Sequence, residues 1–283
     1  MMTQNNAKTA PARYMLEIEH LSKTFNPGTV NEKKAVEDLT LRLAPGDFVT
    51  IIGGNGAGKS TLFNAVAGVF YADSGRVRID GQDVTFLPEY RRSNFIGRLF
   101  QDPLKGTAPH MTIEENLALA YLRTAKTRAP FSRVGKKDRA YFRERLATLG
   151  LGLEDRLTSP VGLLSGGQRQ ALTLLMATLV PPKLLLLDEH TAALDPATAE
   201  KVLALTEKIV AENHLTCMMI THNITSALAL GNRTMMLDEG NLAFELSGDE
   251  RRAMTVEQLL ATFKTHTHKT LDNDRILLSG ARE

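Results

Sequence analysis

The amino-acid sequence predicts an α/β fold built on a mostly parallel sheet, and three observations support this prediction. Strand-like and helix-like segments alternate along most of the chain, which is typical of a parallel sheet covered by helices. Four consecutive leucines at 184–187 predict a parallel strand that is buried on both faces. From residue 111 to about 149 the hydrophobic period becomes helical, so we expect residues from about 102 to 165 to form a separate helical lobe.

Short strands dominate the first part of the chain. The first two alternate between apolar and polar side chains, with a polar turn at 26–34 between them. Pro45 and Gly46 turn the chain into an apolar third strand, and good helix formers at 62–67 follow it. A turn at 73–75 precedes the fourth strand. The expected strands of this part are 15–21, 39–43, 48–52, 76–81 and 95–101.

Longer helices and buried strands make up the rest. Pro196 stands where the first turn of a helix is expected, a position that tolerates proline. A polar turn at 238–241 joins the last two strands into a hairpin. The expected helices are 166–180, 196–213 and 255–263, and the expected strands are 184–187, 215–221, 234–237 and 242–246.

Composition excludes several classes of protein. The 283 residues are 43% hydrophobic and 23% charged, as in ordinary globular proteins, and the net charge of +2 gives no reason to expect nucleic acid. The one cysteine, Cys217, excludes an internal disulfide and lies in an apolar strand, which favours a packed thiol. Residues 1–13 lack an apolar signal segment, and no apolar run is long enough to span a bilayer. We expect a flexible tail at 1–13, one domain at 14–265 and a second tail at 266–283.

A basic stretch lies within the expected helical lobe. Residues 123–145 contain nine Lys or Arg and two Asp or Glu. The usual meaning of such a run is a solvated helix face. The alternative is contact with anionic lipid headgroups or with an acidic loop of a partner.

The phosphate-binding loop is the first chemical motif. It follows the apolar strand 48–52 and precedes a helix, and it fits the pattern G-x-x-x-x-G-K-[ST]. Glycines let backbone N–H groups turn inward toward an anion, and the start of the helix adds its positive dipole end. We expect Lys59 to reach the β- and γ-phosphates and Ser60 to hold Mg²⁺. The loop comprises Gly53, Gly54, Asn55, Gly56, Ala57, Gly58, Lys59, Ser60 and Thr61.

Two further motifs carry chemical groups. In the sequence LSGGQ at 164–168, Ser165 is suited to cap a helix, and Gly166 and Gly167 expose further N–H groups at its start. After the leucine strand, Asp188 is placed to hold Mg²⁺ as the partner of Ser60. Glu189 is placed to orient or deprotonate an attacking water.

Together these motifs resemble those of the ATP-binding-cassette (ABC) ATPases, and the resemblance covers about residues 15–263. The phosphate loop is shared by many nucleotide-binding families, whereas LSGGQ, with Gln168 as its last residue, is the specific signal. The resemblance implies a P-loop NTPase fold with a mostly parallel sheet, an antiparallel β subdomain and a helical lobe.

The resemblance also places other landmarks by their positions. Gln101 matches the Q-loop glutamine that senses Mg²⁺ and the γ-phosphate, and Asp195 matches the D-loop. His222 matches the switch histidine that contacts the γ-phosphate. Phe25 matches the aromatic residue that stacks on adenine, with a core phenylalanine as the alternative.

Three residues depart from the family pattern. His190 replaces the proline that usually follows the catalytic glutamate, here Glu189. Met176 replaces an arginine that usually follows LSGGQ, the signature motif of the family. Gly54 replaces a frequent proline in the phosphate-binding loop. None of these changes removes a catalytic group. His190 is either a structural histidine or an added protonatable group beside Glu189. The sequence Asp-Glu-His-Thr at 188–191 resembles one branch of bacterial importer ATPases, which is linked to amino-acid uptake.

The resemblance implies a head-to-tail dimer. ATP bound at 53–61 of one subunit meets Ser165, Gly166 and Gly167 of the other, with ATP and Mg²⁺ as the ligands. It also implies membrane permease subunits, an extracytoplasmic substrate-binding protein and a peripheral location at the cytoplasmic face of the inner membrane. The predicted function is ATP hydrolysis that energises import. The alternative is a non-transport member, such as a cluster-assembly ATPase, and a phosphate-loop kinase is disfavoured because it would not need LSGGQ.

Overall fold

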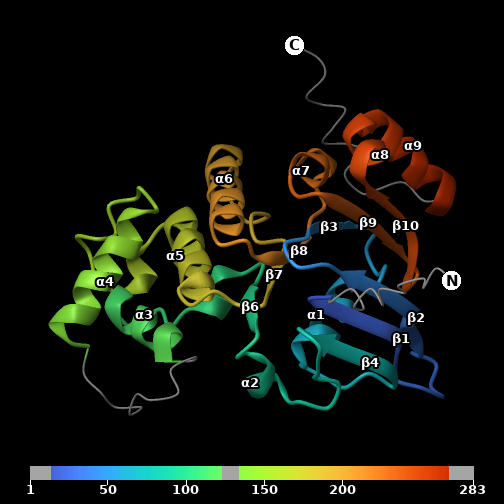
Figure 1. Cartoon of the computed structure of the whole chain (residues 1–283), viewed down its shortest axis with the longest axis horizontal. Coiled ribbons are helices and arrows are strands. Elements are labelled where there is room, and N and C mark those ends of the chain that lie inside the picture. The colour runs from blue at the N-terminus through green and yellow to red at the C-terminus, as the bar shows by residue number, and fades with distance from the viewer. Residues whose placement is uncertain (1–13, 123–133, 268–283) are drawn as a thin grey trace, which may run out of the picture.

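The computed structural model describes residues 14–122 and 134–267 (Figure 1). The tail expected at 1–13, the first half of the basic stretch and nearly all of the tail expected at 266–283 lie outside the described residues. In the view of Figure 1, the helical lobe lies at the left and the smaller sheet at the lower right. The main sheet runs from β6 near the centre to β10 at the right, above the smaller sheet.

The main sheet has the strand order β10-β9-β3-β8-β7-β6, and all neighbours are parallel except β10 and β9. Every residue of β3 and β8 is buried, as are the four leucines of β7, so the prediction of a parallel sheet buried on both faces is confirmed. The strands are β3 (Phe48–Ile52), β6 (Ile96–Leu99), β7 (Leu184–Asp188), β8 (Thr216–Ile220), β9 (Arg233–Asp238) and β10 (Asn241–Ser247).

A smaller antiparallel sheet has the order β2-β1-β4-β5. Its strands are β1 (Leu16–Phe25), β2 (Lys33–Leu43), β4 (Ser74–Ile79) and β5 (Gln82–Asp83). The strand expected at 39–43 therefore begins six residues earlier, because the hairpin continues to the pair Phe25 and Lys33. Shifts of register within β1 and β2 disturb the alternation of buried and exposed side chains, and this concealed the longer strand from the sequence pattern.

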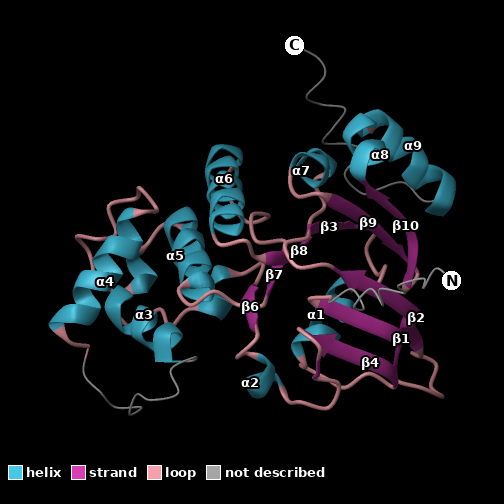
Figure 2. Cartoon of the chain, in the orientation of Figure 1, coloured by secondary structure: helices cyan, strands magenta, loops and turns pink. Residues whose placement is uncertain are grey.

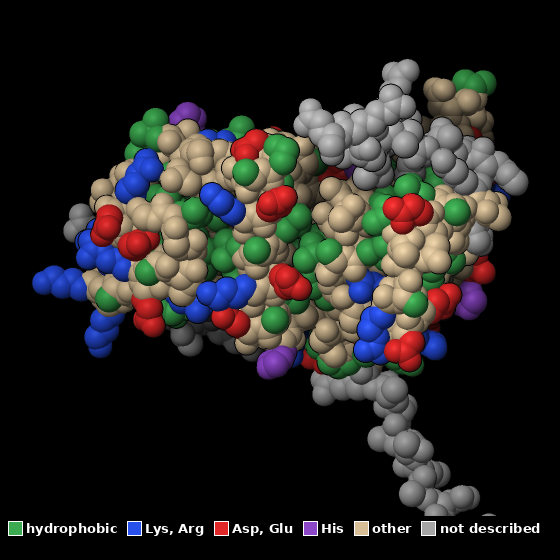
Figure 3. Space-filling model, turned by 90° about the horizontal axis from the view of Figure 1, so that it is seen from above, with side chains coloured by type: hydrophobic (Ala, Val, Ile, Leu, Met, Phe, Trp, Pro, Cys, Tyr) green, Lys and Arg blue, Asp and Glu red, His purple; other side chains and the backbone are tan. Residues whose placement is uncertain are grey.

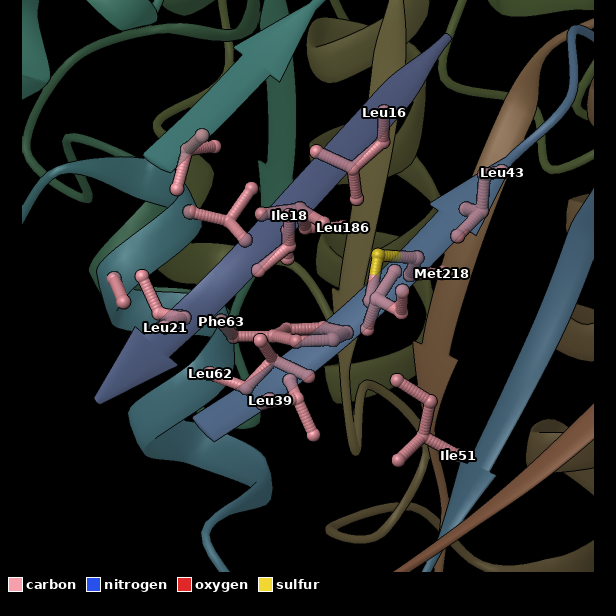
Figure 4. Packing of buried hydrophobic residues seen from close by; sticks show 14 of the residues in the cluster. Leu16, Ile18, Leu21, Leu39, Leu43, Ile51, Leu62, Phe63, Leu186 and Met218 are labelled. Atoms are coloured by element: carbon pink, nitrogen blue, oxygen red, sulfur yellow. The ribbon is translucent and has the colours of Figure 1, made fainter. Parts of the chain in front are cut away.

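One hydrophobic cluster joins the two sheets around helix α1 (Lys59–Ala67). Figure 4 shows Phe63 of α1 lying among leucine and isoleucine side chains of β1 and β2, near Leu186 and Met218 of the main sheet. Because the phosphate loop lies directly between β3 and α1, this packing fixes both ends of the loop.

The helical lobe has a hydrophobic cluster of its own. The helical period expected at 111–149 divides into α3 (Ile113–Leu122) and α4 (Lys136–Ala147), and α5 (Gly166–Thr178) packs against both. Arg139 of α4 forms a bidentate ion pair with Glu114 of α3, at 2.7 and 2.9 Å. Figure 3 shows Lys and Arg side chains at the end of the molecule where this lobe lies.

Helices also cover the main sheet (Figure 2). The structure bears out the expected helices of the second half, α6 (Pro196–Glu212) and α9 (Val256–Thr267), together with α5. The short elements α2 (Glu89–Arg92), α7 (Ile224–Ala229), α8 (Gly248–Ala253), η1 (Pro103–Gly106) and η2 (Val161–Leu163) were not predicted. Elements of three to six residues are too short to show a hydrophobic period.

Arg92 is the largest fully buried side chain among the described residues. Its guanidinium donates to the carbonyl oxygens of Ala65 and Val66 at 2.7 and 2.9 Å. It also donates to the carbonyls of Leu87 and Thr85, each at 2.8 Å. The first two carbonyls belong to the last turn of α1, where a helix leaves carbonyl groups without intrahelical partners and favours positive charge. Arg92 therefore caps the helix whose other end faces the expected phosphates.

Candidate active site

The phosphate loop connects β3 to α1 and depends on glycine at two positions where the backbone enters the left-handed region. Gly53 has φ 152° and Gly58 has φ 96°. A Cβ atom on Gly53 would lie 2.3 Å from the carbonyl oxygen of Leu237, and one on Gly58 would lie 2.3 Å from that of Ala35. Both approaches are far shorter than a van der Waals contact. The loop therefore folds as the motif predicts, and only glycine permits its contacts with β9 and β2.

Lys59 is buried inside the loop that precedes it. Its Nζ donates to the carbonyl oxygens of Gly53 at 2.8 Å and Gly54 at 3.0 Å. Burial lowers the pKa of Lys59, while the carboxylates of Glu189 and Asp188 act to raise it. The next residue, Ser60, is exposed at the start of α1.

The ends of β7 and β8 bring together two residues that the sequence placed in catalysis. These strands are in register with Asp188 opposite Ile220, so the residues that follow them are neighbours. The Nε2 atom of His222 lies 2.6 Å from Oε1 of Glu189. This hydrogen bond is the main reason that the pKa of Glu189 is lowered, with burial acting in the opposite direction. Glu189 has φ 47°, a left-handed conformation that turns the chain sharply after the strand.

Asp188 ends β7 and is paired with an arginine that the sequence reasoning did not select. Nη2 of Arg98 lies 3.7 Å from Oδ2 of Asp188 and donates at 2.7 Å to Oδ1 of Asn64 on α1. Burial raises the pKa of Asp188, and the positive charge of Arg98 opposes this. The guanidinium of Arg98 also lies 4.6 Å from the centre of the Phe100 ring. The sequence contains one signal for this pairing. Arg98 lies within the apolar segment 95–101, where an unpaired charge is costly, so a buried partner is expected.

Two cavities adjoin these carboxylates. One of about 640 Å³ is lined by Asp188, Gln101 and Arg98, so the structure brings the predicted Q-loop residue to the expected Mg²⁺ ligand. The other, of about 760 Å³, is lined by Glu189, His222 and the Gly54–Asn55 part of the phosphate loop. None of Ser165, Gly166, Gly167 and Gln168 lines either cavity.

The signature residues form the start of α5. Ser165 caps this helix as predicted, since its Oγ accepts from the N–H of Gln168 at 3.3 Å. The side chain of Gln168 accepts in turn from the N–H of Ser165 at 3.2 Å. Ser165 and Gly166 are exposed. A Cβ atom on Gly167 would lie 2.2 Å from Cγ2 of Thr198, so α5 and α6 are in close contact at this point.

Two further predicted residues, Asp195 and Phe25, line neither cavity. Asp195 caps α6 by accepting from the N–H of Thr198 at 3.1 Å, and this pair holds the pKa of Asp195 below its usual range. Phe25 is partly exposed at the end of β1 and packs edge-on against Phe70 at 5.4 Å. Its predicted stacking on adenine stays a prediction.

The structure supports the structural interpretation of His190. The side chain is buried, and Nε2 lies 3.1 Å from Oγ1 of Thr206. That hydroxyl donates to the carbonyl oxygen of Val202 at 2.8 Å, so the proton shared with His190 comes from Nε2. Burial lowers the pKa of His190 to about 4. The imidazole therefore stays neutral near pH 7 and anchors the loop after Glu189 to α6.

The oxygen atoms of this site suit a magnesium ion that is held partly by phosphates. Among the described residues, no group of three or more His, Cys, Asp or Glu side chains is arranged to hold a metal alone. Mg²⁺ commonly uses one or two protein oxygens together with substrate phosphates. The predicted set of Ser60, Gln101 and Asp188 offers a hydroxyl, an amide and one carboxylate, which fits this pattern.

Comparisons with known proteins identify the class. Residues 36–192 match the family model described as ABC transporter. Over 251 residues the chain is 43% identical to a tyrosine transport ATP-binding protein of Clostridioides difficile (strain R20291), which covers 88% of this chain and 99% of that protein. Over 234 residues it is 36% identical to a methionine import ATP-binding protein of Enterococcus faecalis (strain ATCC 700802 / V583), covering 82% of this chain and 64% of that protein.

Solved structures agree. A dimeric ATP-binding cassette in a post-hydrolysis state, bound to ADP and Pi, superposes with a TM-score of 0.71 at 29% identity, covering 82% of this chain and 98% of that one. The chain belongs to the ABC transporter family, its fold is the ABC nucleotide-binding domain, and it is an ATPase. The predicted family, fold class and enzyme class are thereby confirmed. No helix in the described residues is long and apolar enough to cross a membrane.

Proposed function

We propose that this protein hydrolyses ATP to energise the import of an amino acid through separate membrane subunits. The observation that best supports ATP hydrolysis here is the pair Glu189 and His222, joined at 2.6 Å beside the phosphate loop. The proposal of an amino-acid substrate rests on the relative named for tyrosine transport, which matches over almost its whole length. The relatives at 43% and 36% identity are named for transport and import, which does not favour the alternative of a cluster-assembly ATPase.

Each residue of the site has a role that its position supports. Backbone N–H groups of the phosphate loop and the ammonium group of Lys59 bind the β- and γ-phosphates. Ser60, Asp188 and Gln101 would hold Mg²⁺, which would supply positive charge to neutralise the phosphates. Glu189 orients and accepts a proton from the attacking water. His222 fixes the Glu189 carboxylate through its hydrogen bond and faces the γ-phosphate.

The signature residues support a head-to-tail dimer. Ser165 and Gly166 are exposed and line neither cavity of their own chain. Exposed N–H groups at the start of a helix favour an anion. A second copy therefore supplies Ser165, Gly166 and Gly167 to the nucleotide bound by the first, and two-fold symmetry creates two equal sites. Loss of the γ-phosphate opens this contact.

Membrane subunits dock, in this proposal, beside the cavity that contains Gln101. Val69, which lines this cavity, is an exposed apolar side chain, and Tyr71, two residues further along the chain, is exposed and lies against the exposed Phe86 ring. Exposed aromatic residues are enriched at protein interfaces. Docking there would place the protein at the cytoplasmic face of the membrane, with an extracytoplasmic substrate-binding protein delivering the amino acid.

Reconstitution tests this function. The protein is combined in proteoliposomes with the permease subunits and the substrate-binding protein encoded beside its gene, and uptake of tyrosine, methionine, choline and spermidine is measured with ATP inside. We expect uptake of one of the amino acids, and none with the Glu189→Gln variant. Uptake of choline or spermidine alone would contradict an amino-acid substrate. Purification with a soluble scaffold and no permease would contradict transport.

A further inference from the structure

Lys33 lies at the open end of the β1–β2 hairpin, directly opposite Phe25 in the register. Directly opposed residues of an antiparallel pair project from the same face of the sheet. Phe25 is the residue expected to contact the adenine. Lys33 therefore occupies the same face of the hairpin as the expected base-binding residue.

The Lys33 side chain extends from the hairpin to the phosphate loop. Its Nζ lies 3.2 Å from the position that a Cβ atom on Gly56 would occupy, and no other non-neighbouring atom lies within 4 Å of that position. The hairpin is held there by neighbouring backbone contacts. Gly240 donates to the carbonyl of Ala57 at 3.1 Å, and Glu37 of β2 donates to the carbonyl of Gly240 at 3.0 Å. The approach of Lys33 to the loop thus follows from the packing of β2.

The charge of Lys33 is not compensated by a carboxylate within the described residues. Lys34 pairs with Glu37 at 3.1 Å, and Glu32 accepts from the N–H of Gly28 at 2.6 Å. Lys33 itself is exposed. An ammonium group beside backbone N–H groups that face an anion site adds to the attraction for phosphate.

We propose that Lys33 binds the nucleotide from the outer side of the phosphate loop, through the phosphates nearest the ribose. This inference rests on the ATPase site described above and adds a residue to it. Glu189, His222 and Gln101 are expected around the γ-phosphate, whereas Lys33 lies on the side of Phe25. The contact is therefore made with the α- or β-phosphate, which ATP and ADP share. Lys33 contributes to affinity and not to hydrolysis.

The test compares the full-length Lys33→Met variant with the wild-type protein and with Lys34→Met. Adjacent residues of a strand point to opposite faces, so Lys34→Met removes the same charge from the other side of the hairpin. Dissociation constants for ATP and ADP are measured by calorimetry at low and high salt, with melting temperature as the control for folding. Turnover at saturating ATP is measured in parallel.

We expect Lys33→Met to weaken ATP and ADP equally, about three- to tenfold at low salt and less at high salt, as for one exposed charged contact. Turnover at saturation stays at the wild-type level, since the contact is equal in the ground and transition states. Lys33→Arg restores affinity, and Lys34→Met changes nothing. Wild-type affinity in Lys33→Met, or an equal loss in Lys34→Met, overturns the proposal. Absence of ATP binding by the wild-type protein would instead overturn the ATPase site on which it rests.

Discussion

Replacing Arg92 by leucine should destabilise the domain strongly, although Arg92 lies outside the nucleotide site. The variant loses four hydrogen bonds from a charged group to main-chain carbonyls. At about 1.5–3 kcal/mol for each such bond, the gross loss is about 6–12 kcal/mol. The wild-type protein loses several kcal/mol by removing the guanidinium of Arg92 from water, and the variant avoids this desolvation cost. We expect the free energy of unfolding to fall by about 3–5 kcal/mol.

The assay is urea unfolding followed by circular dichroism, with Arg91→Leu as the matched control. Arg91 is exposed and its only described contact of note is the ring of Tyr90, with 5.9 Å between the guanidinium and the ring centre. Its replacement should change the free energy of unfolding by no more than about 0.5 kcal/mol. A loss below about 1 kcal/mol in Arg92→Leu would refute the reasoning, because it would mean that the carbonyls of α1 find other partners without cost.

Three further predictions concern the site. Glu189→Gln should reduce ATP turnover by at least about 100-fold, since general base catalysis contributes about 10²–10⁴-fold, and an ATP-bound dimer should accumulate. A turnover assay and size-exclusion chromatography with ATP measure the two effects. Normal turnover would exclude Glu189 as the base. Arg98→Met should lower the free energy of unfolding without nucleotide by about 2 kcal/mol, because Asp188 loses its buried partner; an unchanged urea midpoint would contradict this. His190 has its pKa lowered to about 4, so the unfolded chain binds a proton from about pH 6.5 downward that the folded chain does not. The free energy of unfolding should therefore fall by about 2–3 kcal/mol between pH 7 and pH 4.5 because of this residue. In urea titrations at the two pH values, His190→Leu should lack this part of the decrease. An equal decrease in the wild-type protein and the variant would show that His190 is protonated in the folded protein at about pH 4.5.

Local sequence features predicted those parts of the structure that local forces determine. The strand, loop and helix around 53–61 follow from glycines between an apolar run and helix formers. The starts of α5 and α6 follow from Ser165 and Asp195, whose side chains satisfy free N–H groups at helix ends. The leucine run of β7 indicated burial on both faces and thus its place inside the sheet.

Contacts between distant segments were not predictable in the same way. Arg98 reaches Asn64 and Asp188 only because β6 lies beside β7 in the folded sheet. Lys33 reaches Gly56 through a hairpin whose bulges hide its length. Neither the separation along the chain nor the hydrophobic period predicts such contacts. The sequence did identify His190 as unusual, but its neutral state follows from burial that only the fold creates.

Gly167 matters for how variants of the signature are interpreted. A methyl group at this position would collide with Thr198 at 2.2 Å within the same subunit, whereas one on Gly166 would meet only the movable end of Leu194 at 3.2 Å. Inactivity of Gly167→Ala therefore has two explanations, a separation of α5 from α6 or a lost phosphate contact. Adding Thr198→Ser removes the colliding methyl group, so recovery of activity in the double variant would indicate the first explanation. Because α5 and α6 are in such close contact at this point, we expect the helices that begin after Ser165 and Asp195 to move together in the dimer proposed above.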